Sequence, residues 1–387
     1  MILPMNRVAV SRDTYRWAAD RARLEMPVLA TRFPRLRDWE AGTAAPTLKQ
    51  LEAFAAATYT PVGFFFLPEH PTEAVPIPDF RTARGRPVTA PSANLLDTIY
   101  MCQQRQEWYR DFAGVAGEDP LPFVGSVTNG ADVVATAASI REVIGIDLAE
   151  RRRASTWEEA LRLFIAGAED AGVLVMISGV VLNNTHRLLD PDEFLGFAMA
   201  DSLAPVVFVN GADTKSRQMF TLAHELVHIW AGQTALSNAQ PRQLRVSQSE
   251  QWCNAVAAET LVPAAAMRQA FDGDDDLDLE MRRLARRFKV STLVVLRRIY
   301  DIGGLSRNAF WDAYDAEVDR LHELRERASP GGNFYLTEAA RVSKRFARAI
   351  VTSTIEGQTL YRDAFRLLGF SKAETFRDLG QSLGLQT

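Results

Sequence analysis

The stretch His224-Glu225-Leu226-Val227-His228 constrains this chain more than any other. Two histidines four residues apart on a helix lie on one face, about one turn apart, so both imidazoles can reach one metal ion. Imidazole nitrogen suits Zn²⁺, and a catalytic zinc site usually takes three protein ligands and leaves one position for water. Glu225 is then placed to take a proton from that water. The alternative is a buried histidine pair bonded to backbone carbonyl groups.

The third ligand is predicted on a second helix, which starts at Glu250 and stops at Pro263. Its glutamates, Glu250 and Glu259, lie about 180° apart around the helix axis, so only one of them can face the metal. Glu250 shares its face with small residues that allow close packing against the first helix. We therefore predict Glu250 as the ligand and keep Glu259 as the alternative. Either glutamate alone is also compatible with a solvated helix charge.

These two motifs together resemble the ImmA/IrrE family of bacterial zinc metallopeptidases. The resemblance rests on residues 220–228 and on Glu250-x-x-Cys-Asn254, continued to Pro263. It implies a zincin-like domain in which His224, His228 and Glu250 bind Zn²⁺, because the family's third ligand stands four residues before the asparagine. It also implies that Glu225 is the catalytic base. Val227 stands where the family often has glycine, and it touches neither ligand nor base.

The N-terminal residues carry a weaker resemblance. Residues 39–42 (Trp-Glu-Ala-Gly) and 46–51 (Pro-Thr-Leu-Lys-Gln-Leu) resemble the end of an XRE-type helix-turn-helix domain, and residues 61–67 and 77–82 recur in long members of the peptidase family. The helix that would read DNA is cut short by Pro34. Nearby arginines would contact phosphates, which carry no sequence information. We expect a degenerate bundle that packs on the peptidase or docks a protein partner and binds DNA at most weakly. The alternative is sequence-specific DNA binding by this module.

The fold class predicted from the whole chain is α+β and mainly helical. Residues 1–67 form the helix-turn-helix-like module, and residues 68–92 form a proline-rich linker. Residues 93–303 form the peptidase domain with its preceding helices, and residues 304–387 form a helical C-terminal region. Within the peptidase domain the patterns predict helices near 92–112, 132–144 and 157–171, and strands at 173–178, 194–199 and 205–210. Strands before such a motif helix suit a small peptidase, whose edge strand can pair with an extended substrate.

Composition sets the expected compartment. A formal net charge of −4 gives no general attraction to nucleic acid. Two cysteines argue against a disulfide scaffold, and neither a signal peptide nor an apolar run near the ~20 residues of a membrane span is evident. We expect a cytoplasmic protein without a membrane partner, and the sequence does not give its oligomeric state.

Two further segments suggest sites of their own. Residues 284–298 have helix-turn-helix spacing and several arginines, although in the family this position commonly completes the peptidase domain. Residues 331–335 (Gly-Gly-Asn-Phe-Tyr) resemble an element of the long family members and suit either a loop near a cleft or a simple turn. The remaining histidines, His70, His186 and His322, lack ligand spacing and are expected to be ordinary surface or packing residues.

The function predicted from the sequence is that of a cytoplasmic zinc endopeptidase of narrow specificity. The resemblance implies an XRE-type repressor or an antitoxin-like protein as substrate and partner. One alternative is a DNA-binding regulator in which the zinc is structural or sensory. Another is an interaction module that binds its repressor without cutting it.

Overall fold

The structure is a computed structural model that describes residues 7–79, 90–145, 148–237, 247–326 and 341–385. The chain divides into two compact units, and each is described by itself. The first comprises Met1–Pro76 with Pro87–Tyr100, and the second comprises Ile77–Arg86 with Met101–Thr387.

The first unit is a small helical bundle with an aromatic core. Its helices are α1 (Arg12–Arg21), α2 (Met26–Arg32), α3 (Leu36–Ala41), α4 (Leu48–Ala57) and the 3-10 helix η1 (Val62–Phe66). Tyr15, Trp39, Phe54 and Phe65 are buried and pack their rings together. Pro34 lies between α2, which ends at Arg32, and α3, which has 6 residues and ends before Gly42 in the left-handed conformation. The helix at this position is therefore short, although Gly42 and not Pro34 ends it.

The second unit is built on a four-stranded mixed sheet in the order β1-β5-β4-β6. Strand β1 (Leu174–Ser178) runs parallel to β5 (Val206–Asn210), and the other neighbours, β4 (Gly196–Met199) and β6 (Ala235–Ser237), pair antiparallel. A separate hairpin joins β2 (Val180–Val181) to β3 (Asn184–Leu188). The three predicted strands correspond to β1, β4 and β5, which are apolar because both faces of the sheet are covered.

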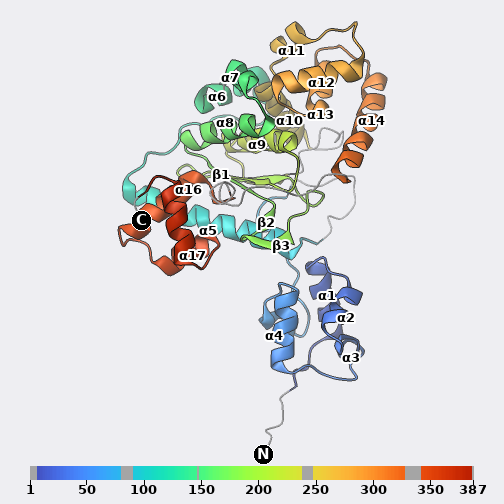
Figure 1. Cartoon of the computed structure of the whole chain (residues 1–387), viewed down its shortest axis with the longest axis vertical. Helices are drawn as coiled ribbons and strands as arrows, with labels where there is room; N and C mark the ends of the chain where they lie inside the picture. The colour runs from blue at the N-terminus through green and yellow to red at the C-terminus, as the bar shows by residue number, and fades with distance from the viewer. Residues whose placement is uncertain (1–6, 80–89, 146–147, 238–246, 327–340, 386–387) are drawn as a thin grey trace, which may run out of the picture. The chain divides into compact units, whose positions relative to one another are not determined.

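Helices pack on both faces of this sheet (Figure 1). On one face lie α8 (Trp157–Asp170) and α9 (Lys215–Trp230), the helix that carries the two histidines. On the other lies the part of α5 (Ala93–Ala116) that belongs to this unit. Helix α16 (Lys344–Ile355) contacts both β1, at the edge of the sheet, and α8. Cys102 and Arg105 of α5 contact the sulfur of Met176 in β1. Strands β4 and β5 therefore pack against α9.

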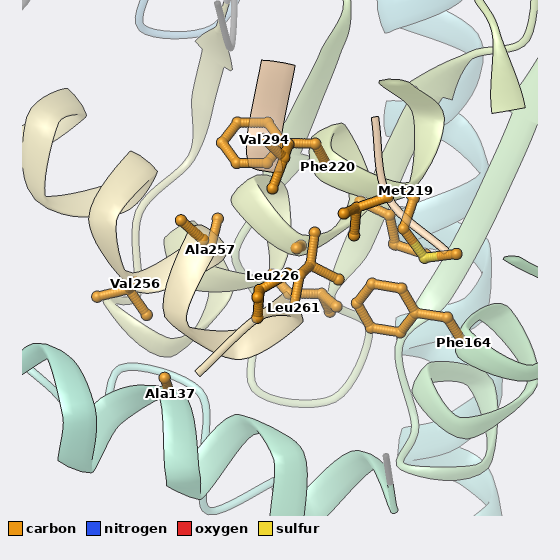
Figure 2. Close-up of a cluster of buried hydrophobic side chains, with 14 of the residues drawn as sticks. Ala137, Phe164, Met219, Phe220, Leu226, Val256, Ala257, Leu261 and Val294 are labelled. Atoms are coloured by element: carbon orange, nitrogen blue, oxygen red, sulfur yellow. The ribbon is translucent and has the colours of Figure 1, made fainter. Parts of the chain in front are cut away.

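Close packing holds the second motif helix, α10 (Gln248–Leu261), between α9 and α6 (Val133–Ile144). Figure 2 shows Leu226 of α9 and Leu261 of α10 meeting in the core, with Ala257 of α10 beside them. Ala257 is fully buried, and its small side chain lets the two helix backbones approach closely. This close approach brings the polar residues of the two helices within reach of one another.

The remaining described segments of the second unit are helical. They are α7 (Leu148–Arg153), α11 (Ala264–Ala270), α12 (Leu277–Phe288), α13 (Thr292–Asp301), α14 (Arg307–Glu326), α17 (Tyr361–Leu368) and α18 (Ala373–Ser382). The prediction of a mainly helical α+β fold with a small sheet is confirmed. The motif at residues 331–335 lies outside the described residues. None of the helices that the structure describes could cross a lipid bilayer.

Candidate metal centre

Helix α9 places both histidines of the motif in the core of the second unit. His224 and His228 are 0% exposed, and their Nε2 atoms lie 3.1 Å apart. The one-turn spacing and the apolar side chains around it explain this position, because the helix is buried on all sides. The two imidazoles therefore face one point.

Glu250 completes the group from the first turn of α10. Its Oε2 lies 3.2 Å from His224 Nε2, and its Oε1 lies 3.3 Å from His228 Nε2. The hydroxyl of Ser247 caps the helix by accepting a hydrogen bond from the Glu250 N–H. Within the described residues these three side chains form the one His/Cys/Asp/Glu group that could hold a metal ion, with ligand atoms inside 4.8 Å of one another.

The surroundings of the group suit a cation. Asn254 Oδ1 lies 3.0 Å from His224 Nδ1, so it accepts the proton on that nitrogen and leaves Nε2 as an electron-pair donor. Glu250 Oε1 is buried without a hydrogen-bond partner. Burial alone would raise the pKa of Glu250, but the two adjacent histidines outweigh it and hold that pKa well below its usual range. Buried lone-pair atoms this close repel one another unless a positive charge lies among them, and a divalent metal ion bound there would supply that charge.

Glu225 lies beside the group, and only one of its two carboxylate oxygens accepts a hydrogen bond. The hydroxyl of Ser237, at the end of β6, donates a hydrogen bond to Glu225 Oε1, whereas Oε2 is buried without a partner. Burial raises the pKa of Glu225 to about 8, although His228 and Ser237 lower it. A Cβ atom at Gly196 of β4 would lie 3.1 Å from Glu225 Oε1 and 2.7 Å from Thr221 Cγ2. A residue without a side chain is therefore what lets β4 pass this carboxylate.

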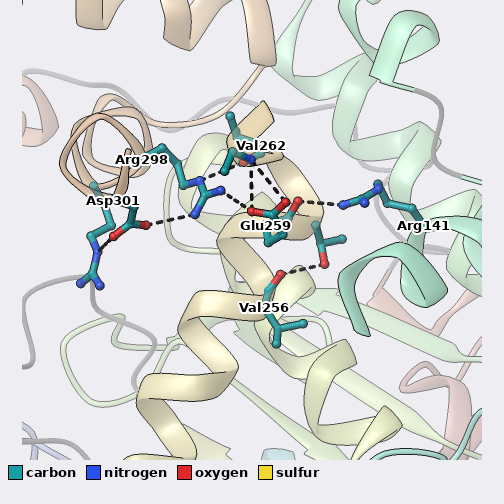
Figure 3. Close-up of polar contacts among 9 residues, drawn as sticks. Arg141, Val256, Glu259, Val262, Arg298 and Asp301 are labelled. Carbon is teal, nitrogen blue, oxygen red and sulfur yellow. Dashed lines mark hydrogen bonds and ion pairs between the residues drawn. The ribbon is translucent and has the colours of Figure 1, made fainter. Parts of the chain in front are cut away.

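Glu259, the alternative ligand, is engaged elsewhere. Its carboxylate forms a buried ion pair with Arg298 and accepts the N–H of Ala264 at 3.1 Å. Arg141 donates to the backbone carbonyl of Glu259 at 2.8 Å, and Arg298 donates to that of Val262 at 2.9 Å. Figure 3 shows these contacts converging on the C-terminal end of α10. Glu259 thus stabilises the C-terminal end of α10, the helix that carries Glu250, and is not part of the group formed with His224 and His228.

The arginine-rich segment at residues 284–298 is packed into the same unit. Arg298 is 5% exposed and points to Glu259, and Arg297 pairs with Asp301 at 2.8 Å. Arg283, just before the segment, pairs with Glu280 at 2.6 Å. The two helices that contain residues 284–298, α12 and α13, pack against each other and contribute to the main core. This arrangement makes the segment part of the domain's structure, as the resemblance implies.

Neither His70 nor His186 belongs to the metal group that the described residues form. His70 stacks on Trp17 in the first unit, with ring centroids 5.2 Å apart. His186 lies on β3, where it is exposed. The side chain of His322 is outside the described part of the chain.

Two residues of the site were missed by sequence reasoning. Asn254 served as a packing residue and as the motif position that identifies Glu250, but its own contact with His224 was not predicted. Ser237 gave no signal, because it stands in a strand of 3 residues and reaches Glu225 only through the folded sheet.

Comparison with known families matches two parts of the chain. Residues 168–300, about a third of the chain, match the peptidase M78 family, described as the IrrE N-terminal-like domain. Residues 342–382 match a domain of unknown function, DUF8813. No curated protein and no solved structure matches the chain.

The M78 match contains every element of the candidate centre. It begins in α8, includes the whole sheet, α9 and α10, and ends in α13. Neither matched range includes the N-terminal helices, so the helix-turn-helix resemblance remains a prediction. Residues 168–300 are thus an IrrE N-terminal-like domain, and the buried His224-His228-Glu250 group that they contain is consistent with a zinc metallopeptidase.

Proposed function

We propose that this chain is a zinc-dependent endopeptidase of narrow specificity. The observation that carries the proposal is the buried group of three ligand atoms with the Glu225 carboxylate beside it. Two imidazoles and one carboxylate are a ligand set that zinc takes in catalytic sites. Zinc bound there would act as a Lewis acid on the scissile carbonyl and would lower the pKa of a bound water.

Three residues around the group have separate roles in the proposed reaction. Glu225 Oε2, which has no partner, accepts the proton of the attacking water and later passes it to the leaving amine. Ser237 holds the other oxygen and so fixes the direction of the carboxylate. Asn254 fixes the tautomer of His224.

A structural zinc site is less consistent with the same geometry. Structural zinc takes four protein ligands, and the group found among the described residues has three. Cys253 is the nearest sulfur, but it lies 3.9 Å from His228 Nδ1, the ring nitrogen that points away from the group. An open fourth position supports catalysis.

The substrate that we propose is an XRE-type repressor or an antitoxin-like protein in the cytoplasm. The support is the family resemblance, together with repressor-like motifs in a first unit whose short α3 makes it a poor reader of DNA. A repressor-like unit would serve the peptidase better by recruiting the substrate, because tethering raises its effective concentration at the site.

The test uses the zinc-loaded full chain and the repressor-like protein encoded beside its gene. Wild-type protein is expected to cut this substrate at one position, and Glu225→Gln is expected to bind the same amount of metal and cut nothing. Gel electrophoresis and mass spectrometry of the products measure both. Proteolysis that persists in Glu225→Gln would refute the role of Glu225, and an uncut substrate would refute the substrate assignment.

A further inference from the structure

The outer edge of the sheet is occupied by the chain's own segment Ile77–Asp79. Strand β6 is the last strand of the sheet, and β4 pairs with only one of its sides. On the other side Asp79 forms a parallel bridge with Leu236, whose N–H donates to the carbonyl of Pro78 at 2.9 Å. Ile77 is 7% exposed and anchors the segment. All of these residues belong to the second unit.

This edge adjoins the candidate catalytic base. Leu236, which pairs with the segment, precedes Ser237, and the hydroxyl of Ser237 donates to Glu225 Oε1. One residue of β6 therefore contacts the segment and the next contacts the base. Neighbouring strands lie ~4.8 Å apart, so any chain paired with this edge passes close to Glu225.

The segment is a poor partner for a strand edge. Pro78 accepts a hydrogen bond but has no N–H to donate, and its ring fixes φ. An extended peptide without proline offers a donor at every residue and pairs more strongly with the same edge. An extended peptide that forms more backbone hydrogen bonds with β6 can therefore displace Ile77–Asp79.

We propose that Ile77–Asp79 is a built-in competitor that occupies the outer edge of β6, the edge at which an extended segment of the substrate is expected to pair. The inference rests on the proposed peptidase function and adds what first blocks the edge at which the substrate main chain pairs. The partner is defined by its chemistry as an extended chain with free backbone N–H and C=O groups.

The test compares three full-length, zinc-loaded proteins, and neither of its measurements depends on cleavage. Ile77→Asp places a carboxylate at the buried anchor and should release the segment. Ala74→Asp adds the same charge at an exposed position and is the matched control. Hydrogen exchange reports the protection of the Leu236 amide. Fluorescence anisotropy measures binding of a labelled synthetic peptide with the sequence of residues 72–79.

In Ile77→Asp, release of the segment should speed hydrogen exchange at the Leu236 amide and tighten peptide binding at least tenfold. Ala74→Asp should match wild type in both measurements. Unchanged exchange, or fast exchange without tighter peptide binding, overturns the proposal. If Ile77→Asp does not fold, Ile77→Ala replaces it, because it removes most of the buried side chain without adding a charge and should tighten peptide binding about two- to fivefold. Loss of zinc or of cleavage with these binding results intact would instead count against the proposed function.

Discussion

Each ligand of the metal group makes its own prediction at the residue scale. Wild-type protein should hold about one zinc ion per chain, as a single three-ligand site requires. His224→Ala, His228→Ala and Glu250→Gln should lose tight zinc, because each removes one donor atom from the group. Glu259→Gln should keep it, since Glu259 bonds Arg298 and not the histidines. Elemental analysis decides, and zinc retained by Glu250→Gln but lost by Glu259→Gln would show that the ligand choice is wrong.

Ser237 is predicted to position the base without binding the metal. Ser237→Ala frees Glu225 Oε1, so we expect kcat to fall about ten- to a hundredfold, with metal content and KM close to wild type. Ser139→Ala is the control, because that hydroxyl bonds Trp230 and should leave turnover unchanged. Steady-state kinetics on the cleaved repressor measures both. Equal kcat values for the two variants would remove Ser237 from the mechanism.

The parts of the site that the sequence predicts are those with local spacing. His224, Glu225 and His228 share one helix, so helical geometry alone groups them. The third ligand required a choice between Glu250 and Glu259, which lie on opposite faces of one helix. The small residues beside Glu250 and the family resemblance both favoured Glu250. The contact of Ser237 with Glu225 depends on how β6 pairs with β4, and no local pattern encodes that pairing.

At the scale of elements, both ends of α10 are fixed by polar contacts. Glu250 lies at its first turn, and at its last turn the carbonyls of Glu259, Leu261 and Val262 accept hydrogen bonds from three arginines, Arg141, Arg151 and Arg298. Cations at a helix C-terminus satisfy unpaired carbonyl groups and oppose the negative end of the dipole. The arginines thereby hold the helix that presents the third ligand, and Figure 3 shows two of them, Arg141 and Arg298.

Arg298 should therefore matter more for stability than its neighbour Arg297. Arg298→Met leaves the buried carboxylate of Glu259 without its partner, which costs about 3–5 kcal/mol of unfolding free energy. Arg297→Met breaks an exposed pair with Asp301 and should cost less than about 1 kcal/mol. Denaturant unfolding measures both. The double variant Arg298→Met/Glu259→Gln should recover part of the loss, and similar costs for the two single variants would contradict the role of the buried pair.

The elements follow from the sequence where they are long and apolar. The predicted helices near 132–144 and 157–171 appear as α6 and α8, and the predicted strands appear as β1, β4 and β5. Strand β6 and the hairpin β2–β3 were not predicted. β6 has too few residues to show a period of two, and β3 (Asn-Thr-His-Arg-Leu) is largely polar.

At the scale of the whole molecule, charge and packing argue against tight DNA binding. The net charge is −4, and α3 is a helix of 6 residues. We expect weak binding that falls steeply with salt, because phosphate contacts would dominate. Electrophoretic shifts with DNA from upstream of the gene test this across salt concentrations. A nanomolar, sequence-dependent complex at physiological salt, weakened by Arg35→Ala or Arg37→Ala, would favour the DNA-binding regulator instead.

The position of Glu250 in the first turn of α10 has a kinetic consequence. Helix ends fray more readily than helix middles, and the Ser247 cap is what resists fraying at this end. An opening of that turn would withdraw the carboxylate from the two histidines, which lie in the buried middle of α9. The residence time of a metal ion bound there would thereby be coupled to the lifetime of a single helical turn.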